Sequence, residues 1–161
     1  MPTPALTALT SANIDHRVIR HGPVSSLEEA AAARGVEIPD VVKTIVVRRS
    51  DDDYYFVLVP GGRAISWPKL RTLLDVNRLS MPDAATAKAV TGYERGTITP
   101  FGSATPWPVI ADAAIPSLER VAIGGGGHGV NLHLSGSDLV RFLSADVAEV
   151  TRPDEPRPAV A

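Results

Sequence analysis

The strongest constraint on the fold of this chain is a pair of apolar runs separated by a short acidic turn. Residues 41–49 are rich in β-branched side chains, residues 50–53 are polar, and residues 54–59 are again apolar. β-branched and aromatic residues favour strands, and a short polar connection joins neighbouring strands that run in opposite directions. We therefore predict a β-hairpin over residues 41–59.

The flanking segments carry both helix and strand signals. Ser26 followed by Glu29 matches a capping box at a helix start, and Gly35 is a natural place for that helix to end. Apolar and polar residues alternate over residues 130–134, which predicts a half-buried strand with His133 on its exposed face. The later strands follow one another directly, which favours antiparallel pairing. We predict a mixed α/β (α+β) fold with a central, mostly antiparallel sheet or barrel-like sheet surrounded by helices.

The length of 161 residues suits one ordinary domain. A chain of this size buries roughly 70% of its extended-chain surface on folding, which is enough for a hydrophobic core. Residues 152–161 hold three prolines and four charged side chains and show no periodicity. We predict a single domain over residues 1–151 and a disordered tail over residues 152–161.

The composition excludes several classes of protein. The chain has no cysteine, which excludes a disulfide scaffold, cysteine-bound zinc, an iron–sulfur cluster and a thiol nucleophile. Its formal net charge of −2 gives no general basic field for binding nucleic acid, and we expect no DNA partner. No apolar stretch of about 18 residues and no secretory signal occur, so we expect a cytoplasmic protein without a membrane partner. No HExxH, EF-hand or GxSxG pattern occurs, and we expect neither a metal nor a cofactor.

Gly124, Gly126 and Gly129 satisfy the GxGxxG spacing of dinucleotide-binding loops. Such a loop follows a strand and opens a helix, whereas here the next segment is the predicted strand over residues 130–134. The simpler interpretation is a turn between two strands. A further interpretation is that the glycines, which have no Cβ, let a substrate approach the backbone closely.

Lys43 is the one charged residue in an otherwise apolar row. It shares one face of its strand with Val41, Ile45 and Val47. The commoner arrangement is a lysine at a strand end, with its stem on apolar surface and its ammonium in water, because lysine is rarely fully buried. The alternative is a cation at the rim of a pocket, where it would hold an anionic or carbonyl-bearing ligand.

Residues 92–102 form a glycine-containing segment in which Pro100 fixes the backbone path. It is either a structural loop with a turn at Thr99-Pro100 or a rigid surface whose N–H groups point into a cleft. One well-placed donor to a developing oxyanion is worth about 2.7–4 kcal/mol. His128, which follows the glycine run, is either a turn histidine in solvent or a titratable group beside a pocket.

Together these segments resemble the YbaK/prolyl-tRNA-synthetase-associated domain family. Val42-Lys43-Thr44-Ile45 is similar to its lysine-bearing motif, and Gly96-Thr97-Ile98-Thr99-Pro100, which follows Gly92-Tyr93, is similar to its GxxxP loop. The glycine run that leads into Gly129-Val130-Asn131-Leu132 and the helix at Asp138-Leu139 resemble its C-terminal part. The resemblance covers residues 14–150.

The resemblance implies an aminoacyl-tRNA deacylase, a trans-editing enzyme that hydrolyses the ester bond of mischarged tRNA. Such editing is needed because a synthetase rejects an amino acid smaller by one methylene by only about 1–3 kcal/mol. The resemblance also implies a barrel-like fold, a reaction without metal or cofactor, and assistance from the substrate's own 2′-hydroxyl or side chain. The expected partner is the acceptor end of a mischarged tRNA, and a synthetase is a candidate second partner.

Carried over residue by residue, the resemblance assigns catalytic roles to Lys43, Gly96 and His128. Lys43 would engage the terminal adenosine, while residues 96–100 would shape the acyl pocket and present backbone groups to the carbonyl. The expected substrate-binding residues are Thr44, Thr97, Ile98, Thr99, Pro100, Gly125 and Gly126.

Two other functions stay open at this point. A non-catalytic module of the same fold that binds tRNA or a synthetase would also lack a nucleophile. A protein that binds small anions would use the glycine turn. The deacylase hypothesis requires that the Lys43 ammonium and residues 96–100 face one cavity.

Overall fold

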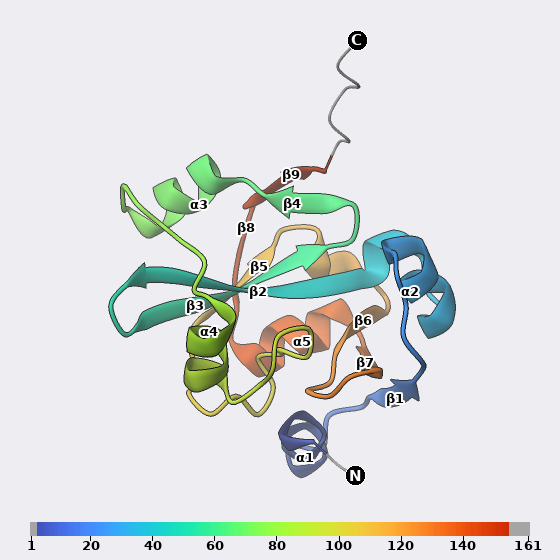
Figure 1. Ribbon diagram of the computed structural model, residues 1–161. Coiled ribbons are helices and arrows are strands. Elements are labelled where there is room, and N and C mark those ends of the chain that lie inside the picture. Colours follow the sequence, from blue (N-terminus) through green and yellow to red (C-terminus); the bar gives the residue numbers. More distant parts are fainter. Residues whose placement is uncertain (1–2, 155–161) are drawn as a thin grey trace.

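A seven-stranded sheet with the strand order β1-β7-β6-β2-β3-β5-β8 forms the centre of the molecule, and β4 and β9 form a second, two-stranded sheet (Figure 1). This computed structural model describes residues 3–154. Its elements in chain order are α1 (Pro4–Ser11), β1 (Arg17–Arg20), α2 (Leu27–Arg34), η1 (Ile38–Asp40), β2 (Val41–Ser50), β3 (Asp53–Pro60), β4 (Arg63–Ile65), α3 (Trp67–Leu74), α4 (Ala84–Thr91), β5 (Val109–Asp112), η2 (Ile115–Ser117), β6 (Val121–Gly124), β7 (Val130–Leu134), α5 (Gly136–Leu143), β8 (Asp146–Ala148) and β9 (Thr151–Pro153).

The predicted hairpin over residues 41–59 is confirmed as β2 and β3. The two strands pair antiparallel, with Lys43 opposite Val59, and the register shifts only near the turn, between Arg48 and Ser50. The Arg48 guanidinium forms an ion pair with Asp51 in that turn. The β-branched run and the acidic connection therefore form the structure that their composition favours.

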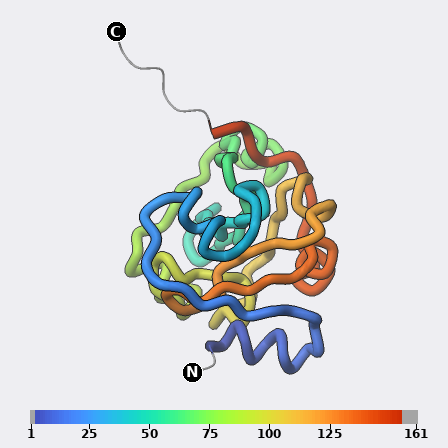
Figure 2. Tube along the Cα trace, turned by 90° about the vertical axis from the view of Figure 1, so that its right-hand side faces the viewer, coloured from blue at the N-terminus to red at the C-terminus, as the bar shows by residue number. Residues whose placement is uncertain are grey.

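The predicted mixed α/β fold is also confirmed. Antiparallel pairing joins β1 to β7, β7 to β6, and β2 to β3, while β2/β6, β3/β5 and β5/β8 are parallel. The sheet is open, with β1 and β8 as its outer strands. Figure 2, turned by 90°, shows the N-terminal segment running past β6 and β7 on its way to α2.

The strands place their side chains alternately on two hydrophobic clusters. On one face Val42, Val46 and Phe56 belong to the larger cluster, which also contains residues of α1 and α5. On the other face Val47 and Val57 pack with residues of β4 and α3. In Figure 1, α3 and the β4-β9 pair lie on one side of the central sheet, and α4 and α5 lie on the other.

Helix α2 begins and ends as its sequence predicts. The Ser26 side chain accepts the N–H of Glu29 at 3.0 Å, and Gly35 takes the left-handed conformation at φ +70° after the last helical residue. Each of the five α-helices in the described residues has eight residues, and none is long and apolar enough to cross a membrane.

Two predictions are wrong in detail. Arg152 and Pro153, placed in the tail, belong to β9 because this strand pairs with β4 and Arg63 donates to the Thr151 hydroxyl at 2.6 Å. Asp154 is also held, because its N–H donates to the Gly62 carbonyl at 3.0 Å, while residues 155–161 lie outside the described residues. His133 is only 4% exposed rather than at the surface.

Candidate functional site

A cavity of about 870 Å³ lies along one edge of β2, and we name it the β2-edge cavity. Its walls come from β2, from α2, from the start of α4 with the residues before it, from Arg95, Gly96 and Ile98, and from the end of β6. Its lining residues are Leu27, Ala30, Arg34, Val41, Val42, Lys43, Thr44, Ile45, Val46, Met81, Pro82, Asp83, Ala84, Ala87, Arg95, Gly96, Ile98 and Gly124.

The cavity exists because the middle of β2 has no neighbouring strand on this side within residues 3–154. Strand β6 pairs with β2 only at Val41 and Val42. Further along, Arg48 donates its N–H to the Ser80 carbonyl at 2.7 Å, and Ser80 donates back to Arg48 at 3.1 Å. The backbone between these two contacts is left as an open edge.

The backbone groups on this open edge can be identified from the pairing. The N–H and C=O of alternate strand residues point to the same side. Those of Arg48 point away from β3, toward Ser80, so those of Thr44 and Val46 point to the same open side. The Thr44 hydroxyl adds a further polar group, because its Oγ1 is buried and has no hydrogen-bond partner in the described structure.

Lys43 lies on the strand face opposite to Thr44. Its side chain is exposed, lines the β2-edge cavity and carries its Nζ 3.5 Å from the carbonyl oxygen of Arg63. Among the described residues it forms no ion pair with a carboxylate. Its positive charge is therefore available to a ligand.

Residues 93–101 form a firmly held loop. The buried Tyr93 hydroxyl donates to the Phe101 carbonyl at 2.6 Å, and burial raises the pKa of that phenol to about 12. The Thr97 hydroxyl donates to the Glu94 carbonyl at 2.7 Å and closes a tight turn. These contacts fix the path of the backbone that reaches the cavity.

Two of the predicted loop residues, Gly96 and Ile98, line the β2-edge cavity. Gly96 has a φ of +88°, a conformation that favours glycine. Among residues 3–154 the N–H groups of Gly96 and Ile98 have no hydrogen-bond acceptor, so both are available to a ligand or a water molecule.

The other predicted loop residues do not reach the cavity. Thr97, Thr99 and Pro100 are buried and are absent from its lining. The Thr99 Oγ1 is buried without a partner in the described structure. Ile98 therefore lines the cavity, while its neighbours Thr97 and Thr99 are buried away from it.

The glycine run forms the turn between β6 and β7, as the simpler interpretation expected. A Cβ built on Gly125 would lie 2.8 Å from Cγ1 of Val130, and one built on Gly126 would lie 2.7 Å from Cε1 of Tyr93. These two predicted substrate-binding residues therefore pack against protein, and it is Gly124 that lines the β2-edge cavity.

His128 lies outside the lining of the cavity but near Gly96. A Cβ built on Gly96 would lie 3.9 Å from Cε1 of this histidine. The exposed imidazole has its Nε2 3.6 Å from a carboxylate oxygen of Glu94, which also pairs with Lys88. His128 is thus attached to the outer side of the loop.

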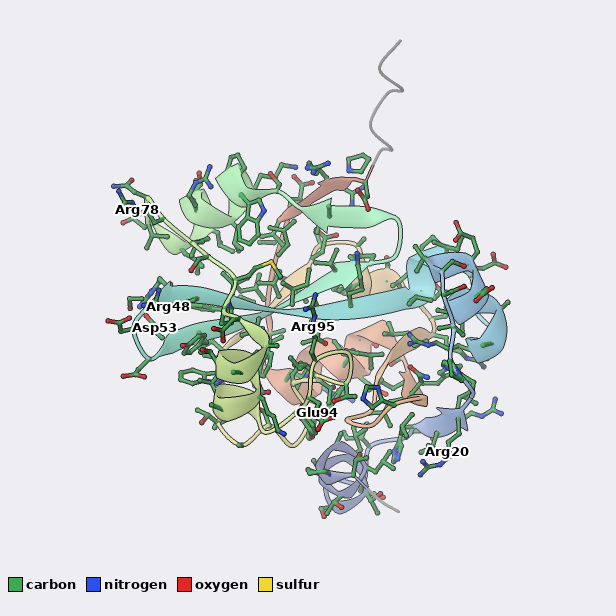
Figure 3. All side chains as sticks on the ribbon, viewed as in Figure 1. Arg20, Arg48, Asp53, Arg78, Glu94 and Arg95 are labelled. Carbon is green, nitrogen blue, oxygen red and sulfur yellow. The ribbon has the colours of Figure 1, made fainter. Side chains whose placement is uncertain are left out.

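The charges around the β2-edge cavity are mostly positive. Arg34, Lys43 and Arg95 line it, against the single carboxylate of Asp83. Figure 3 shows the Arg95 side chain reaching from its loop toward β2. Asp83 accepts the N–H of Thr86 at the start of α4, which lowers the pKa of its carboxyl. The cavity therefore suits an anionic ligand.

Sequence reasoning missed Arg34 and Arg95. Arg34 is the last residue of α2, where a basic residue is common because it interacts favourably with the helix C-terminus. Arg95 lies inside the loop that the sequence singled out, but only the glycines and the proline of that loop received a role. Which basic side chains line the same cavity depends on packing between segments that are far apart in the sequence.

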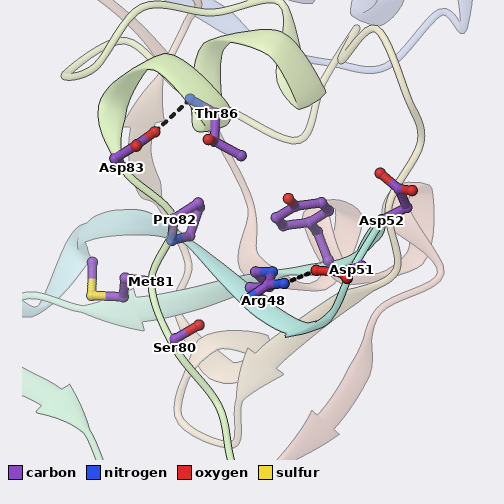
Figure 4. A pocket seen from close by; sticks show the side chains of 9 residues that line it. Arg48, Asp51, Asp52, Ser80, Met81, Pro82, Asp83 and Thr86 are labelled. Carbon is purple, nitrogen blue, oxygen red and sulfur yellow. Dashed lines mark hydrogen bonds and ion pairs between the residues drawn. The ribbon is translucent and has the colours of Figure 1, made fainter.

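A second hollow of about 500 Å³ lies on the other side of residues 80–83 (Figure 4). It is lined by Asp51, Asp52 and Asp83, and its one basic residue, Arg48, is already paired with Asp51. In the described residues no group of three histidine, aspartate or glutamate side chains could hold a metal ion. The β2-edge cavity is thus the better candidate site.

Residues 21–142 match the family described as the aminoacyl-tRNA editing domain. The proline–tRNA ligase of Caldicellulosiruptor saccharolyticus is 29% identical over 134 residues, which are 81% of this chain and 23% of the ligase. The same enzyme of Desulfovibrio desulfuricans is 33% identical over 134 residues, with 81% of this chain and 22% of the ligase covered. The chain thus spans less than a quarter of the length of these relatives.

Solved structures share the fold over nearly the whole chain. A protein proposed to be a trans-editing enzyme for prolyl-tRNA synthetase superposes with a TM-score of 0.85 at 23% identity, covering 94% of this chain and 99% of that one. A hypothetical protein superposes with a TM-score of 0.84 at 25% identity, covering 93% and 100%.

Proposed function

The chain belongs to the aminoacyl-tRNA editing domain family, and from this premise we propose that it is an aminoacyl-tRNA deacylase that hydrolyses the ester bond of mischarged tRNA. One observation links the proposed activity to particular residues. Lys43, Thr44, Gly96 and Ile98 line one cavity, although the first two lie about fifty positions from the others in the sequence.

The properties of the β2-edge cavity suit the 3′ end of an aminoacylated RNA. Ligand sites commonly have volumes of about 300–1,000 Å³, and this cavity has about 870 Å³. The RNA end brings a nucleoside, phosphodiester anions and an ester carbonyl. Cations at the rim can attract the phosphates, while free N–H groups can bind the carbonyl oxygen.

In the proposed reaction a water molecule attacks the carbonyl carbon of the ester. The bond from that carbon to the ribose oxygen breaks, the amino acid leaves as a carboxylic acid, and the ribose oxygen takes a proton. The N–H groups of Gly96 and Ile98 stabilise the charge that develops on the carbonyl oxygen, and each such donor is worth about 2.7–4 kcal/mol. The substrate's own 2′-hydroxyl or side chain assists, as the resemblance implies.

The remaining predicted residues take supporting roles in this proposal. Lys43 holds the terminal adenosine end, and Thr44 supplies its unpartnered hydroxyl to the substrate. Residues 97, 99 and 100, together with Gly125 and Gly126, keep the loop and turn in place rather than touching the substrate. His128 acts from the outer side of the loop, and its removal lowers the rate less than the removal of Lys43.

The proposal is tested by deacylation assays on a panel of alanyl-, cysteinyl-, seryl- and threonyl-tRNA. Each of these amino acids is attached to proline tRNA, because the curated relatives are proline–tRNA ligases. We expect the wild-type protein to hydrolyse at least one member and Lys43→Ala to abolish that activity. Lys69→Ala is the matched control, because Lys69 is an exposed lysine outside the cavity lining. A wild-type protein that leaves the whole panel intact would contradict the proposal.

A second candidate is a non-catalytic module that binds tRNA or a synthetase. It is favoured by one observation, the lack of a nucleophile paired with a general base in the cavity lining. Binding of mischarged tRNA without turnover, or retention by a prolyl-tRNA synthetase without hydrolysis, would select it over the deacylase.

A further inference from the structure

Arg34 is a partly buried cation for which the protein supplies no counter-ion. It ends α2 and lines the β2-edge cavity, as Gly96 does. Among residues 3–154 no carboxylate pairs with it, and burial alone lowers the pKa of its guanidinium. Removing a charge from water without a partner is unfavourable, so such a group is expected to have a function.

The Arg34 side chain is held in place by a contact with His21. The Nδ1 of His21 lies 2.7 Å from the Gly22 carbonyl, which only accepts, so Nδ1 carries the ring proton and Nε2 is an acceptor. That Nε2 accepts from Nε of Arg34 at 3.4 Å and from Nδ2 of Asn131 at 2.7 Å. The contact with His21, which Asn131 of β7 holds in turn, therefore orients the guanidinium.

This arrangement leaves the outer end of the guanidinium unoccupied. The contact with His21 uses only Nε, and the Nη1 and Nη2 groups have no acceptor in the described part of the chain. Those two groups form the planar fork that binds two oxygens of a phosphate at once. A carbonyl or a single hydroxyl would satisfy only part of that fork.

We propose that Arg34, oriented by His21 and Asn131, forms a phosphodiester-binding subsite of the β2-edge cavity. The inference rests on the proposed function for the identity of its ligand, which is the RNA backbone that leads to the 3′-terminal adenosine. An RNA whose last nucleoside lies between β2 and the Gly96 loop must leave the cavity past a wall. The α2 wall carries the unpaired guanidinium beside the apolar Leu27 and Ala30.

The first test measures binding of uncharged proline tRNA as a function of salt, so it does not depend on hydrolysis. Each phosphate contact contributes about 0.7–0.9 to the slope of log affinity against log salt. We expect Arg34→Gln to weaken binding roughly tenfold or more and to lower the slope by about one contact. Arg34→Lys keeps the charge and loses the fork, so it should retain the slope and recover only part of the affinity.

Arg141→Gln is the matched control, because this exposed arginine lies on α5 and pairs with Asp138. It should leave both affinity and slope unchanged. Thermal unfolding of Arg34→Gln should show no loss of stability, since the variant removes a partly buried charge that has no counter-ion. An unchanged affinity and slope in Arg34→Gln, or a wild-type protein that does not bind tRNA, overturns the inference.

The second test compares two substrates that differ only in phosphates. With the mischarged tRNA that the wild type hydrolyses, we expect Arg34→Gln to raise KM and to leave kcat nearly unchanged. With the corresponding aminoacyl-adenosine, which has no phosphodiester, wild type and variant should react equally. Equal losses on both substrates would overturn the phosphate assignment. A wild-type protein that binds tRNA but hydrolyses neither substrate would refute the deacylase proposal. The salt dependence of tRNA binding by wild type and Arg34→Gln would still decide whether Arg34 contacts a phosphate.

Discussion

Replacing Gly96 by alanine tests whether the backbone of the loop takes part in the proposed reaction. Gly96 has a φ of +88°, and an L-residue in such a conformation costs roughly 1–2 kcal/mol. The only atom within 4 Å of the added Cβ would be Cε1 of His128 at 3.9 Å, so no clash is added. For a chain of this length that strain lowers Tm by about 2–8 °C.

The expected loss of activity is larger than the loss of stability. The strain is relieved if the peptide units around residue 96 rotate, and this rotation moves the free N–H groups of Gly96 and Ile98 away from the carbonyl. The loss of one such donor lowers the rate by about 10²–10³. The assay is single-turnover deacylation of the most reactive mischarged tRNA, well below the Tm of every variant.

Gly62→Ala provides the matched control. Gly62 has a φ of +80°, its added Cβ would meet only Cγ2 of Ile38 at 4.0 Å, and it does not line the β2-edge cavity. It should therefore lose the same stability as Gly96→Ala and keep the wild-type rate. If the two variants lost activity equally, or if Gly96→Ala kept full activity, the role given to the loop backbone would be refuted.

Three further predictions follow from buried polar groups. Thr44→Val removes the unpartnered Oγ1 at nearly constant side-chain volume. The free energy of unfolding, measured in urea, should therefore stay equal or rise, while the KM of the deacylase, measured by steady-state kinetics, should increase. Tyr93→Phe leaves the Phe101 carbonyl without its donor and should destabilise the protein by about 1–3 kcal/mol in urea unfolding; an unchanged midpoint would contradict the contact. Burial and the charges of Arg120, Arg17 and Arg34 lower the pKa of His133 below 6.5, so the unfolded state takes up a proton first as the pH falls. The free energy of unfolding should therefore decrease below pH 6.5 by at most about 1.4 kcal/mol per pH unit. His133→Phe should remove this contribution to the pH dependence of stability. Urea unfolding of the variant and the wild type at several pH values would show it.

Local sequence patterns predicted much of the fold because they act over short distances. The hairpin of β2 and β3 follows from two β-branched runs and an acidic turn, and the ends of α2 follow from Ser26 and Gly35. The short strand β4 was not predicted, since its three residues form a strand only by pairing with β9, far along the chain.

His133 shows where a local pattern fails. Its alternation with Leu132 and Leu134 correctly places it on the opposite face of β7 from the main core. That face is nevertheless buried, because the histidine is 4% exposed and both ring nitrogens lack partners in the described structure. Alternation gives the side of a strand and does not show what covers that side.

The candidate site was predicted in part for a similar reason. Lys43, Thr44, Gly96 and Ile98 were singled out from sequence, and all four line the β2-edge cavity. The open edge of β2 could not be foreseen, because it depends on β6 pairing with only two residues of that strand. The contribution of Arg34 likewise depends on long-range contacts, because its side chain meets His21, which Asn131 of β7 holds.

The most direct measurement of the central claim is an NMR titration of the protein with an amide-linked aminoacyl-adenosine, which cannot be hydrolysed as an ester. If the β2-edge cavity binds the aminoacylated end, the largest shifts of backbone amide signals should occur at Lys43, Thr44, Val46, Gly96 and Ile98. Shifts confined to the acidic hollow at Asp51, Asp52 and Ser80, or no shifts at saturating ligand, would contradict the account.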